Sequence, residues 1–272
     1  MFVAVDYLGP VGVGATTPQI FRAIDTRTHG KAKIYIVKFS NNKLGAKVLV
    51  NELLALRFGE VLGLCFPPGG IIEIPRETII KSRRLLSFRA MPGQHFASEF
   101  LRGAEYLGRH NIHLAVNKEQ MAGVMLFDHM FYNLDRTWNR KNLIIRRERE
   151  GFKIYAIDNS HLFRRGRWTS EWLEELEDGF NVNSRRSFGL LLKHYLYPDD
   201  FFWWADKIRA VSNRQIELLV DSIPAQWLPD KAERYSLKHF IFKRRDMADQ
   251  IACRLVELIP DIHWSSDFDQ DI

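Results

Sequence analysis

Blocks of apolar residues divide the chain into a strand-rich beginning and a helix-rich remainder. Residues Ile34–Phe39 are rich in β-branched and aromatic side chains, which is typical of a β-strand. A helix is expected from about Leu44 to Leu62, because apolar residues recur there at the spacing of a helical stripe. Three further short strands are expected at Gln19–Ile24, Ile71–Ile74 and Leu85–Ala90.

The pattern changes in the second third of the chain. Residues 96–133 are expected to be helical. A β-hairpin is expected next, with strand-like runs at Leu143–Arg147 and Phe152–Ile157 on either side of the turn Glu148–Gly151. From about Thr169 onward, helical patterns alternate with proline breaks.

These elements predict an α+β protein made of two lobes. A small β-rich N-terminal lobe is expected over residues 1–90, and a mostly helical C-terminal lobe over residues 91–272. A chain of 272 residues is long enough for two lobes that share a cleft.

Composition narrows the class of protein. Hydrophobic residues make up 46% of the chain and charged residues 26%, which is an ordinary globular balance. No stretch approaches the roughly 18 uncharged apolar residues that a membrane span needs, and the first residues do not resemble a signal peptide. Cys65 and Cys253 are too few for a disulfide framework, so a reducing cytoplasm is expected.

Net charge adds a hint about ligands. The charge is +6 and the pI is about 9.3, which favours an anionic ligand or partner. The basic pairs are scattered along the chain, so nucleic-acid binding is the less favoured interpretation.

The predicted hairpin carries a candidate metal site. Its turn is centred near residue 149 or 150, so antiparallel partners should have numbers that sum to about 299 or 300. Asn142 and Asp158 would then lie opposite each other at the open end, roughly 5 Å apart at Cβ. Oxygen atoms of both side chains could hold one Mg²⁺ at that separation.

Asp135 lies just before the hairpin, in the sequence Asn133-Leu134-Asp135-Arg136. Two carboxylates that are close together repel each other unless a cation or a shared proton intervenes. A metal ion at Asp158 would relieve this repulsion and leave Asp135 to orient or deprotonate an attacking hydroxyl group.

The first lobe contains residues that suit phosphate binding. Lys38 is embedded in an apolar strand and needs a partner, because an unpaired buried charge is costly. Glu52, on the apolar stripe of the following helix, is the expected partner. A lysine held in this way could contact nucleotide phosphates, but the two residues alone equally favour an ion pair that only ties strand to helix.

A glycine-rich stretch near the N-terminus, Gly12-Val13-Gly14-Ala15-Thr16-Thr17, precedes one of the expected short strands. Small residues allow backbone N–H groups to approach a phosphate closely. By itself the stretch also fits an ordinary turn.

Taken in this order, the motifs resemble the HipA-like branch of the protein-kinase superfamily, whose relatives include the type II phosphatidylinositol 4-kinases. The resemblance is specific around Tyr35–Leu64 and Phe127–Phe163. It implies a two-lobed protein-kinase-like fold that binds ATP and Mg²⁺ in the cleft.

The resemblance also implies roles for individual residues. Asp135 would be the catalytic aspartate, Lys38 the phosphate-contacting lysine with Glu52 as its partner, and Asp158 a metal ligand. The second metal ligand would be Asn142 or Asn139, and the hairpin register favours Asn142. The remaining nucleotide contacts would come from the phosphate loop, Gly12, Gly14, Thr16 and Thr17, and from an adenine hinge at Leu86–Met91 that includes Phe88 and Met91.

The predicted activity is therefore transfer of phosphate from ATP to a Ser or Thr hydroxyl of a protein. The same residues would serve a lipid or small-molecule kinase, and a pseudokinase that binds nucleotide without turnover is a further alternative. The resemblance to HipA also implies an antitoxin-like partner protein.

Overall fold

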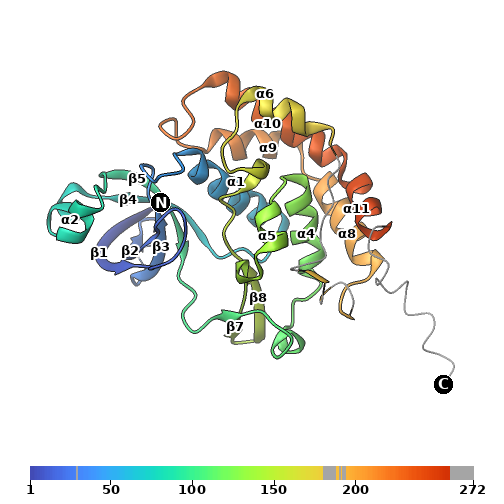
Figure 1. Ribbon diagram of the computed structural model, residues 1–272, viewed down its shortest axis with the longest axis horizontal. Coiled ribbons are helices and arrows are strands. Elements are labelled where there is room, and N and C mark those ends of the chain that lie inside the picture. The colour runs from blue at the N-terminus through green and yellow to red at the C-terminus, as the bar shows by residue number, and fades with distance from the viewer. Residues whose placement is uncertain (29, 180–187, 190, 192–193, 258–272) are drawn as a thin grey trace.

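Five strands close into a small barrel at the N-terminal end of the protein, and helices form most of the remainder (Figure 1). The computed structural model describes residues 1–28, 30–179, 188–189, 191 and 194–257. The α+β fold expected from the sequence is confirmed. The barrel strands are β1 (Phe2–Pro10), β2 (Gln19–Asp25), β3 (Lys33–Lys38), β4 (Gly69–Ile74) and β5 (Gly93–Glu99).

The barrel order is β1-β2-β3-β5-β4, and β4 closes it by pairing with β1 in the only parallel contact among these strands. Alternate side chains of the strands point to the inside of the barrel. They form one barrel core, which includes Phe21, Val37 and Ile72. Two short helices, α2 (Arg76–Ile80) and α3 (Arg83–Ser87), add Ile79 and Leu85 to this core.

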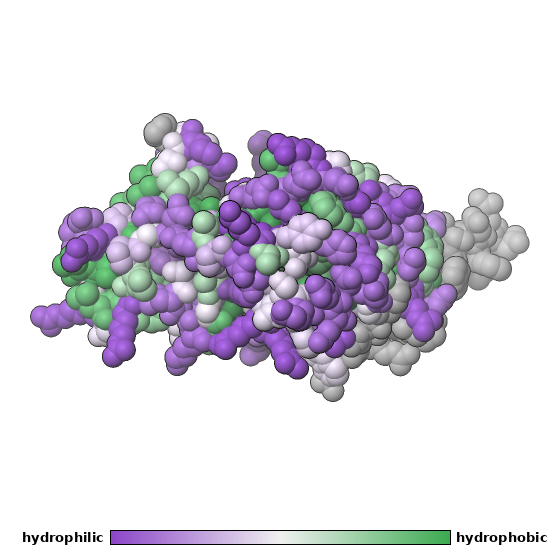
Figure 2. All heavy atoms as spheres, turned by 90° about the horizontal axis from the view of Figure 1, so that it is seen from above, coloured by the Kyte–Doolittle hydropathy of each residue, from purple (hydrophilic) through white to green (hydrophobic). Residues whose placement is uncertain are grey.

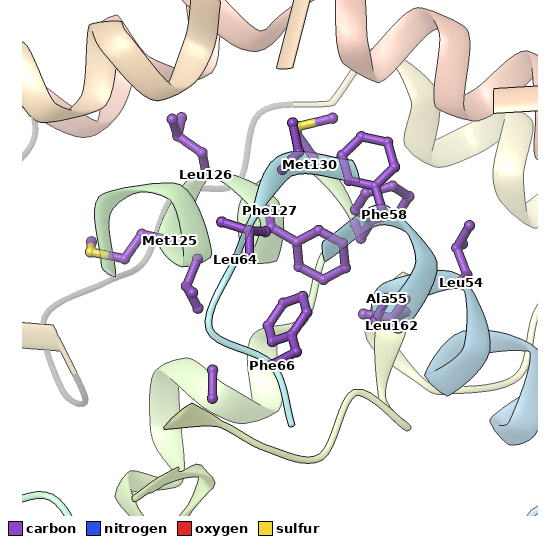
Figure 3. Close-up of a cluster of buried hydrophobic side chains, with 14 of the residues drawn as sticks. Leu54, Ala55, Phe58, Leu64, Phe66, Met125, Leu126, Phe127, Met130 and Leu162 are labelled. Atoms are coloured by element: carbon purple, nitrogen blue, oxygen red, sulfur yellow. The ribbon is translucent and has the colours of Figure 1, made fainter. Parts of the chain in front are cut away.

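Helix α1 (Lys47–Leu62) joins the barrel to the helical part. It is buried along most of its length because it packs into the larger core of the helical part, not into the barrel core. Figure 3 shows Leu54 and Phe58 of α1 together with Phe66 and Phe127, which come from the following loop and from α4 (Gln120–Met130). The ring centroids of Phe58 on α1 and Phe127 on α4 lie 6.0 Å apart. This packing attaches α1 to the helical part.

The helical part surrounds α4, of which every residue after the first is buried. Gly123 is required at its contact with α8, because an added Cβ would lie 2.4 Å from the Trp204 ring. The other elements are β6 (Glu105–Tyr106), α5 (Leu134–Trp138), β7 (Leu143–Glu148), β8 (Gly151–Ala156), α6 (Ser170–Glu177), α8 (Pro198–Arg209), α9 (Asn213–Asp221), α10 (Lys231–Asp246), α11 (Ala248–Glu257), and the short 3₁₀ turns η1 (Ile112–Leu114), η2 (Arg140–Asn142) and η3 (Leu162–Arg164).

The predicted hairpin is present as β7 and β8, with β6 as a third strand. Its register runs from Leu143 opposite Ala156 to Glu148 opposite Gly151, so partner numbers sum to 299. One step beyond the strands, the Ile157 N–H donates to the Asn142 carbonyl over 2.9 Å. Asp158 therefore lies one residue past the position directly opposite Asn142.

Three expectations about the path of the chain are wrong. Leu85–Ala90 is not a strand, because the Ser82 side chain accepts a hydrogen bond from the Leu85 N–H and starts helix α3. Residues 96–133 are not continuously helical, since β5, β6 and η1 precede α4. The barrel extends through β5 to Glu99 and does not stop at residue 90. The far end of the expected helical lobe, residues 258–272, lies outside the described residues.

Apolar side chains are unevenly distributed over the surface. Figure 2 shows apolar surface gathered at the barrel end and hydrophilic side chains over much of the helical part. Exposed apolar residues on the barrel and its two short helices include Leu8, Ile80 and Leu86. Among the described helices, none is long and apolar enough to cross a membrane.

His95 on β5 is buried in a fixed neutral form. Its Nδ1 accepts from the Ser40 N–H over 3.0 Å, and its Nε2 lies 2.8 Å from the Met91 carbonyl, to which it donates. Burial lowers the pKa of His95 to about 4. The His95 imidazole therefore takes up a proton near pH 6.5 in the unfolded chain, but only near pH 4 in the folded chain.

Lowering the pH from about 6.5 to about 4 should therefore cost about 3 kcal/mol of unfolding free energy through His95. Denaturant unfolding across this pH range measures the loss. His95→Asn keeps an acceptor for Ser40 but cannot titrate, so it should reduce the pH dependence. An unchanged pH dependence in this variant would contradict the expectation. Buried His129, whose pKa is also lowered to about 4 by burial, would still contribute.

Candidate active site

Lys38, the last residue of β3, links three distant segments. Its Nζ donates to a carboxylate oxygen of Glu52 on α1, and over 2.8 Å to Oδ1 of Asp158 after β8. Burial by itself would lower the pKa of Lys38, but the charges of Asp158 and Glu52 raise it above its ordinary value. Lys38 is therefore a cation held by two carboxylates, as its apolar surroundings require.

Asp158 is held in a strained conformation at this junction. Its φ of 60° lies in the left-handed region, which is rare for a residue that is not glycine. Besides the contact with Lys38, its Oδ1 accepts from the Ser160 N–H over 3.2 Å and from the Ser160 hydroxyl over 2.5 Å. Burial opposes ionisation, but the charge of Lys38 and these hydrogen bonds lower the pKa of Asp158 well below its usual range. Asp158 is therefore an anion at neutral pH.

Asp135 lies in the first turn of α5, where a carboxylate is favoured by the helix dipole. Its Oδ2 accepts a 2.7 Å hydrogen bond from the side-chain amide of Asn142. The structure thus brings Asn142 to Asp135, whereas the sequence placed it opposite Asp158. Asn139 instead caps the turn η2, since its Oδ1 accepts from the Lys141 N–H. The Asn139 N–H donates to the Asp135 backbone carbonyl over 2.8 Å, but of the two asparagine side chains it is that of Asn142 that contacts the Asp135 carboxylate.

A buried ionic cluster beneath these residues was missed from the sequence. The Arg136 Nε lies 3.1 Å from Asp128 Oδ2, and both side chains have no exposed surface. Asn133 donates to the other oxygen of Asp128 over 3.0 Å, and Arg136 donates to the side chain of Asn159. One guanidinium therefore connects α4 to the residues next to Asp135 and Asp158. An aspartate inside the most apolar stretch of the chain was the signal that could have revealed it.

Asn51 on α1 was also missed. Its amide donates to the carbonyls of Ser160 and Gly166 over 2.9 and 3.0 Å, and its Oδ1 accepts from the Trp168 indole over 3.0 Å. Gly166 is required here, because an added Cβ would lie 2.5 Å from the Ser160 carbonyl oxygen. The segment that follows Asp158 is thus attached to the same helix that carries Glu52.

The glycine-rich stretch connects β1 and β2. Gly12 and Gly14 have φ values of 86° and 105°, which other residues rarely adopt, so both glycines are needed for this turn. Thr16 is buried, and the hydroxyl of Thr17 donates to its carbonyl over 2.8 Å. The stretch is therefore a tight turn between two barrel strands, and its role in phosphate binding stays a prediction.

Phe88 and Met91 are not brought to the other candidate residues. Phe88 packs against Phe39, which belongs to the barrel core, with the ring centroids 5.4 Å apart. Met91 has a half-exposed side chain, and its carbonyl is occupied by His95. Both precede β5, whereas the chain leaves the barrel after Glu99. The geometry gives no support to an adenine hinge at Leu86–Met91.

The side-chain atoms around Asp158 that could ligate a metal ion are mostly oxygens. The predicted site offers three sets of side-chain oxygens. They are Asp158 Oδ2, Asn142 Oδ1, which accepts from the Asn139 amide over 3.4 Å, and the Asp135 carboxylate, whose Oδ2 accepts from Asn142. Oxygen ligands of this kind suit Mg²⁺. Within the described residues, no group of three or more His, Cys, Asp or Glu side chains could by itself hold a metal ion. A metal ion here would need further oxygens from water or phosphate.

The fold and this arrangement of residues define a kinase-like protein, and comparison with known proteins identifies the family. A family model described as HipA-like kinase matches residues 10–183. The chain therefore belongs to the HipA-like kinase family. No curated protein sequence matches it.

Solved structures that match this chain include a kinase and a component of a toxin–antitoxin complex. The Helicobacter pylori proinflammatory kinase CtkA is 12% identical, with a TM-score of 0.56 and coverage of 92% of this chain and 94% of that one. A chain of the Shewanella oneidensis toxin–antitoxin complex of HipA, HipB and operator DNA is 14% identical, with a TM-score of 0.43 and coverage of 93% and 68%.

Proposed function

We propose that the protein is an ATP-dependent kinase that transfers the γ-phosphate of MgATP to a Ser or Thr hydroxyl of a protein. The observation that carries this proposal is the position of Lys38, which contacts Glu52 and Asp158 at once, while Asp135 and Asn142 form a second pair. A lysine, two acidic partners and a separate aspartate are the parts that kinase chemistry needs. The membership of a kinase family supports the same conclusion.

Each residue has a distinct task in this proposal. Lys38 binds the α and β phosphates, and the backbone around Gly12 and Gly14 covers them. Asp135 aligns the acceptor hydroxyl and takes its proton. Mg²⁺ held by Asp158 and Asn142 would neutralise charge on the phosphates. The rate then comes mainly from positioning and from charge stabilisation.

Transfer of labelled γ-phosphate from MgATP, to the protein itself and to a cell lysate, tests the proposal. Wild type should label a protein at Ser or Thr, and chelation of Mg²⁺ should abolish the signal. Asp158→Ala should lower transfer below detection and weaken the Mg²⁺ dependence of ATP binding, because it removes an ionised metal ligand. Labelled lipid or small molecules in place of protein would make the acceptor class wrong.

ATP binding without transfer to any of these acceptors would favour a pseudokinase. An antitoxin-like partner stays a prediction, and isolation of the tagged protein with its bound proteins tests it.

A further inference from the structure

Arg164 and Arg165 follow Asp158 in the chain and are exposed to solvent, but the side chain of each packs against an aromatic ring. The Arg164 guanidinium lies 5.1 Å from the ring centroid of Tyr132, and the Arg165 guanidinium lies 4.7 Å from that of Trp172. Tyr132 is itself held, because its hydroxyl donates to the Leu176 carbonyl over 2.8 Å. Stacking on a fixed ring restrains a guanidinium and occupies its flat face.

The edges of these two guanidiniums remain available. Among the residues that the structure describes, neither Arg164 nor Arg165 forms an ion pair or donates a side-chain hydrogen bond. Arg244 shows the contrast, because it also stacks on Tyr132 but donates to the carbonyls of Met130 and His129. Unoccupied guanidinium edges match a carboxylate through two parallel hydrogen bonds.

The two arginines are fixed next to the loop that carries Asp135. The N–H groups of Phe163 and Arg164 donate to the carbonyls of Phe131 and Tyr132 over 2.7 and 3.1 Å. Phe163 and Arg164 have φ values of 58° and 70°. This left-handed turn buries the Phe163 side chain while it leaves both arginines in solvent. Strain of this kind persists only where the surroundings enforce it.

Two more basic residues are exposed near this part of the sequence. Arg167 follows the pair and donates to the carbonyls of Lys43 and Leu44, and within the described residues it forms no ion pair. Lys141 follows α5, the helix that carries Asp135. Helix α6 is acidic and lies nearby. The acidic residues at its C-terminal end, Glu177 and Asp178, do not neutralise the arginines, since both are paired with Lys243.

We infer that Arg164 and Arg165 form an anion-binding rim that selects acceptor segments carrying carboxylate side chains close to the phosphorylated hydroxyl. That the bound segment is a phosphate acceptor rests on the proposed function, whereas the binding of an acidic peptide does not. A protein segment is favoured over a nucleic acid because the rim is short, while a nucleic acid requires a longer basic track along its backbone.

Binding of three labelled peptides to the full chain with MgADP tests the inference. The peptides share a central Ser and differ only in flanking Glu, Gln or Lys residues. The Glu peptide should bind about tenfold more tightly than the Gln peptide, as two exposed charge pairs allow. Arg164→Gln/Arg165→Gln should remove this preference. Arg83→Gln/Arg84→Gln makes the same charge change on exposed residues of α3 and should keep it.

Equal affinity for the Glu and Gln peptides, absence of binding, or equal loss in both double variants would overturn the inference. It would also be overturned if an RNA oligomer bound more tightly than the Glu peptide through the same two arginines. Phosphate transfer to the same peptides tests the proposed function separately from peptide binding. Acidic preference in binding without transfer to any peptide would contradict the kinase proposal and leave the rim intact.

Discussion

Asp135→Asn is expected to lower the rate of phosphate transfer about 10²- to 10⁴-fold, the usual contribution of a positioned general base. The amide cannot take a proton from the acceptor hydroxyl. It can still accept a hydrogen bond from Asn142, which contacts this side chain over 2.7 Å in the wild type. The variant should therefore fold normally and bind MgATP with little change in affinity. Steady-state transfer and nucleotide titration measure the two effects separately.

Asp206→Asn is the matched control for this prediction. It makes the same chemical change on α8, where the aspartate side chain is 78% exposed and its one ion pair with the described residues is to Arg209 at 3.9 Å. Its rate should equal that of the wild type. A rate of Asp135→Asn within about threefold of the wild type would remove Asp135 from the chemistry, since a general base contributes far more than that.

Arg136→Leu is expected to lower the free energy of unfolding by about 3–5 kcal/mol, because it leaves Asp128 buried without its counter-charge. The cost should be smaller at about pH 5 than at about pH 8. Burial already raises the pKa of Asp128 to about 7 with Arg136 in place, and removal of the cation raises it further, so acid neutralises the stranded carboxyl group. Urea unfolding at both pH values measures the difference.

The double variant Asp128→Leu/Arg136→Leu should be more stable than Arg136→Leu alone, because a neutral pair leaves no buried charge. Arg209→Leu provides a surface control. The Arg209–Asp249 pair is separated by 2.6 Å but both side chains are about half exposed, so its loss should cost less than about 1 kcal/mol. A loss below about 1 kcal/mol for Arg136→Leu at both pH values would mean that Asp128 is neutral or hydrated in the folded protein.

Whether a sequence prediction was correct depended on how close in sequence the residues that determine the feature lie. The hairpin was predicted correctly, because a short turn determines the register of the strands beside it. The contact between Lys38 and Glu52 could also be anticipated, since a strand and the next helix bring residues 14 positions apart together. The family resemblance was confirmed by the matching family model. The roles of the individual residues stay predictions that the variants above would test.

The predictions that failed depended on neighbours distant in the sequence. The run Leu85–Ala90 is apolar enough for a strand, but the cap at Ser82 and the place of Leu85 in the barrel core make it a helix. Asp158 lies one residue past the position opposite Asn142 because the hairpin register sums to 299, and the Asn142 side chain donates to Asp135. Both outcomes required knowledge of what packs against the segment.

The sequence by itself determined the hairpin, the strand of Lys38 and the helix of Glu52, because hydrophobic period and turn residues act within a few positions, and its motifs were enough for the family resemblance. The tertiary structure decided which charges share a site. Lys38 meets Asp158 across 120 positions of sequence, and Arg136 meets Asn159 across 23. The contact of Lys38 with Asp158 exists because α1 packs into the helical core while it also contacts β4 and β5, and so places Glu52 and Asn51 beside the segment after β8. Such packing depends on the shapes of distant side chains, which no local pattern encodes.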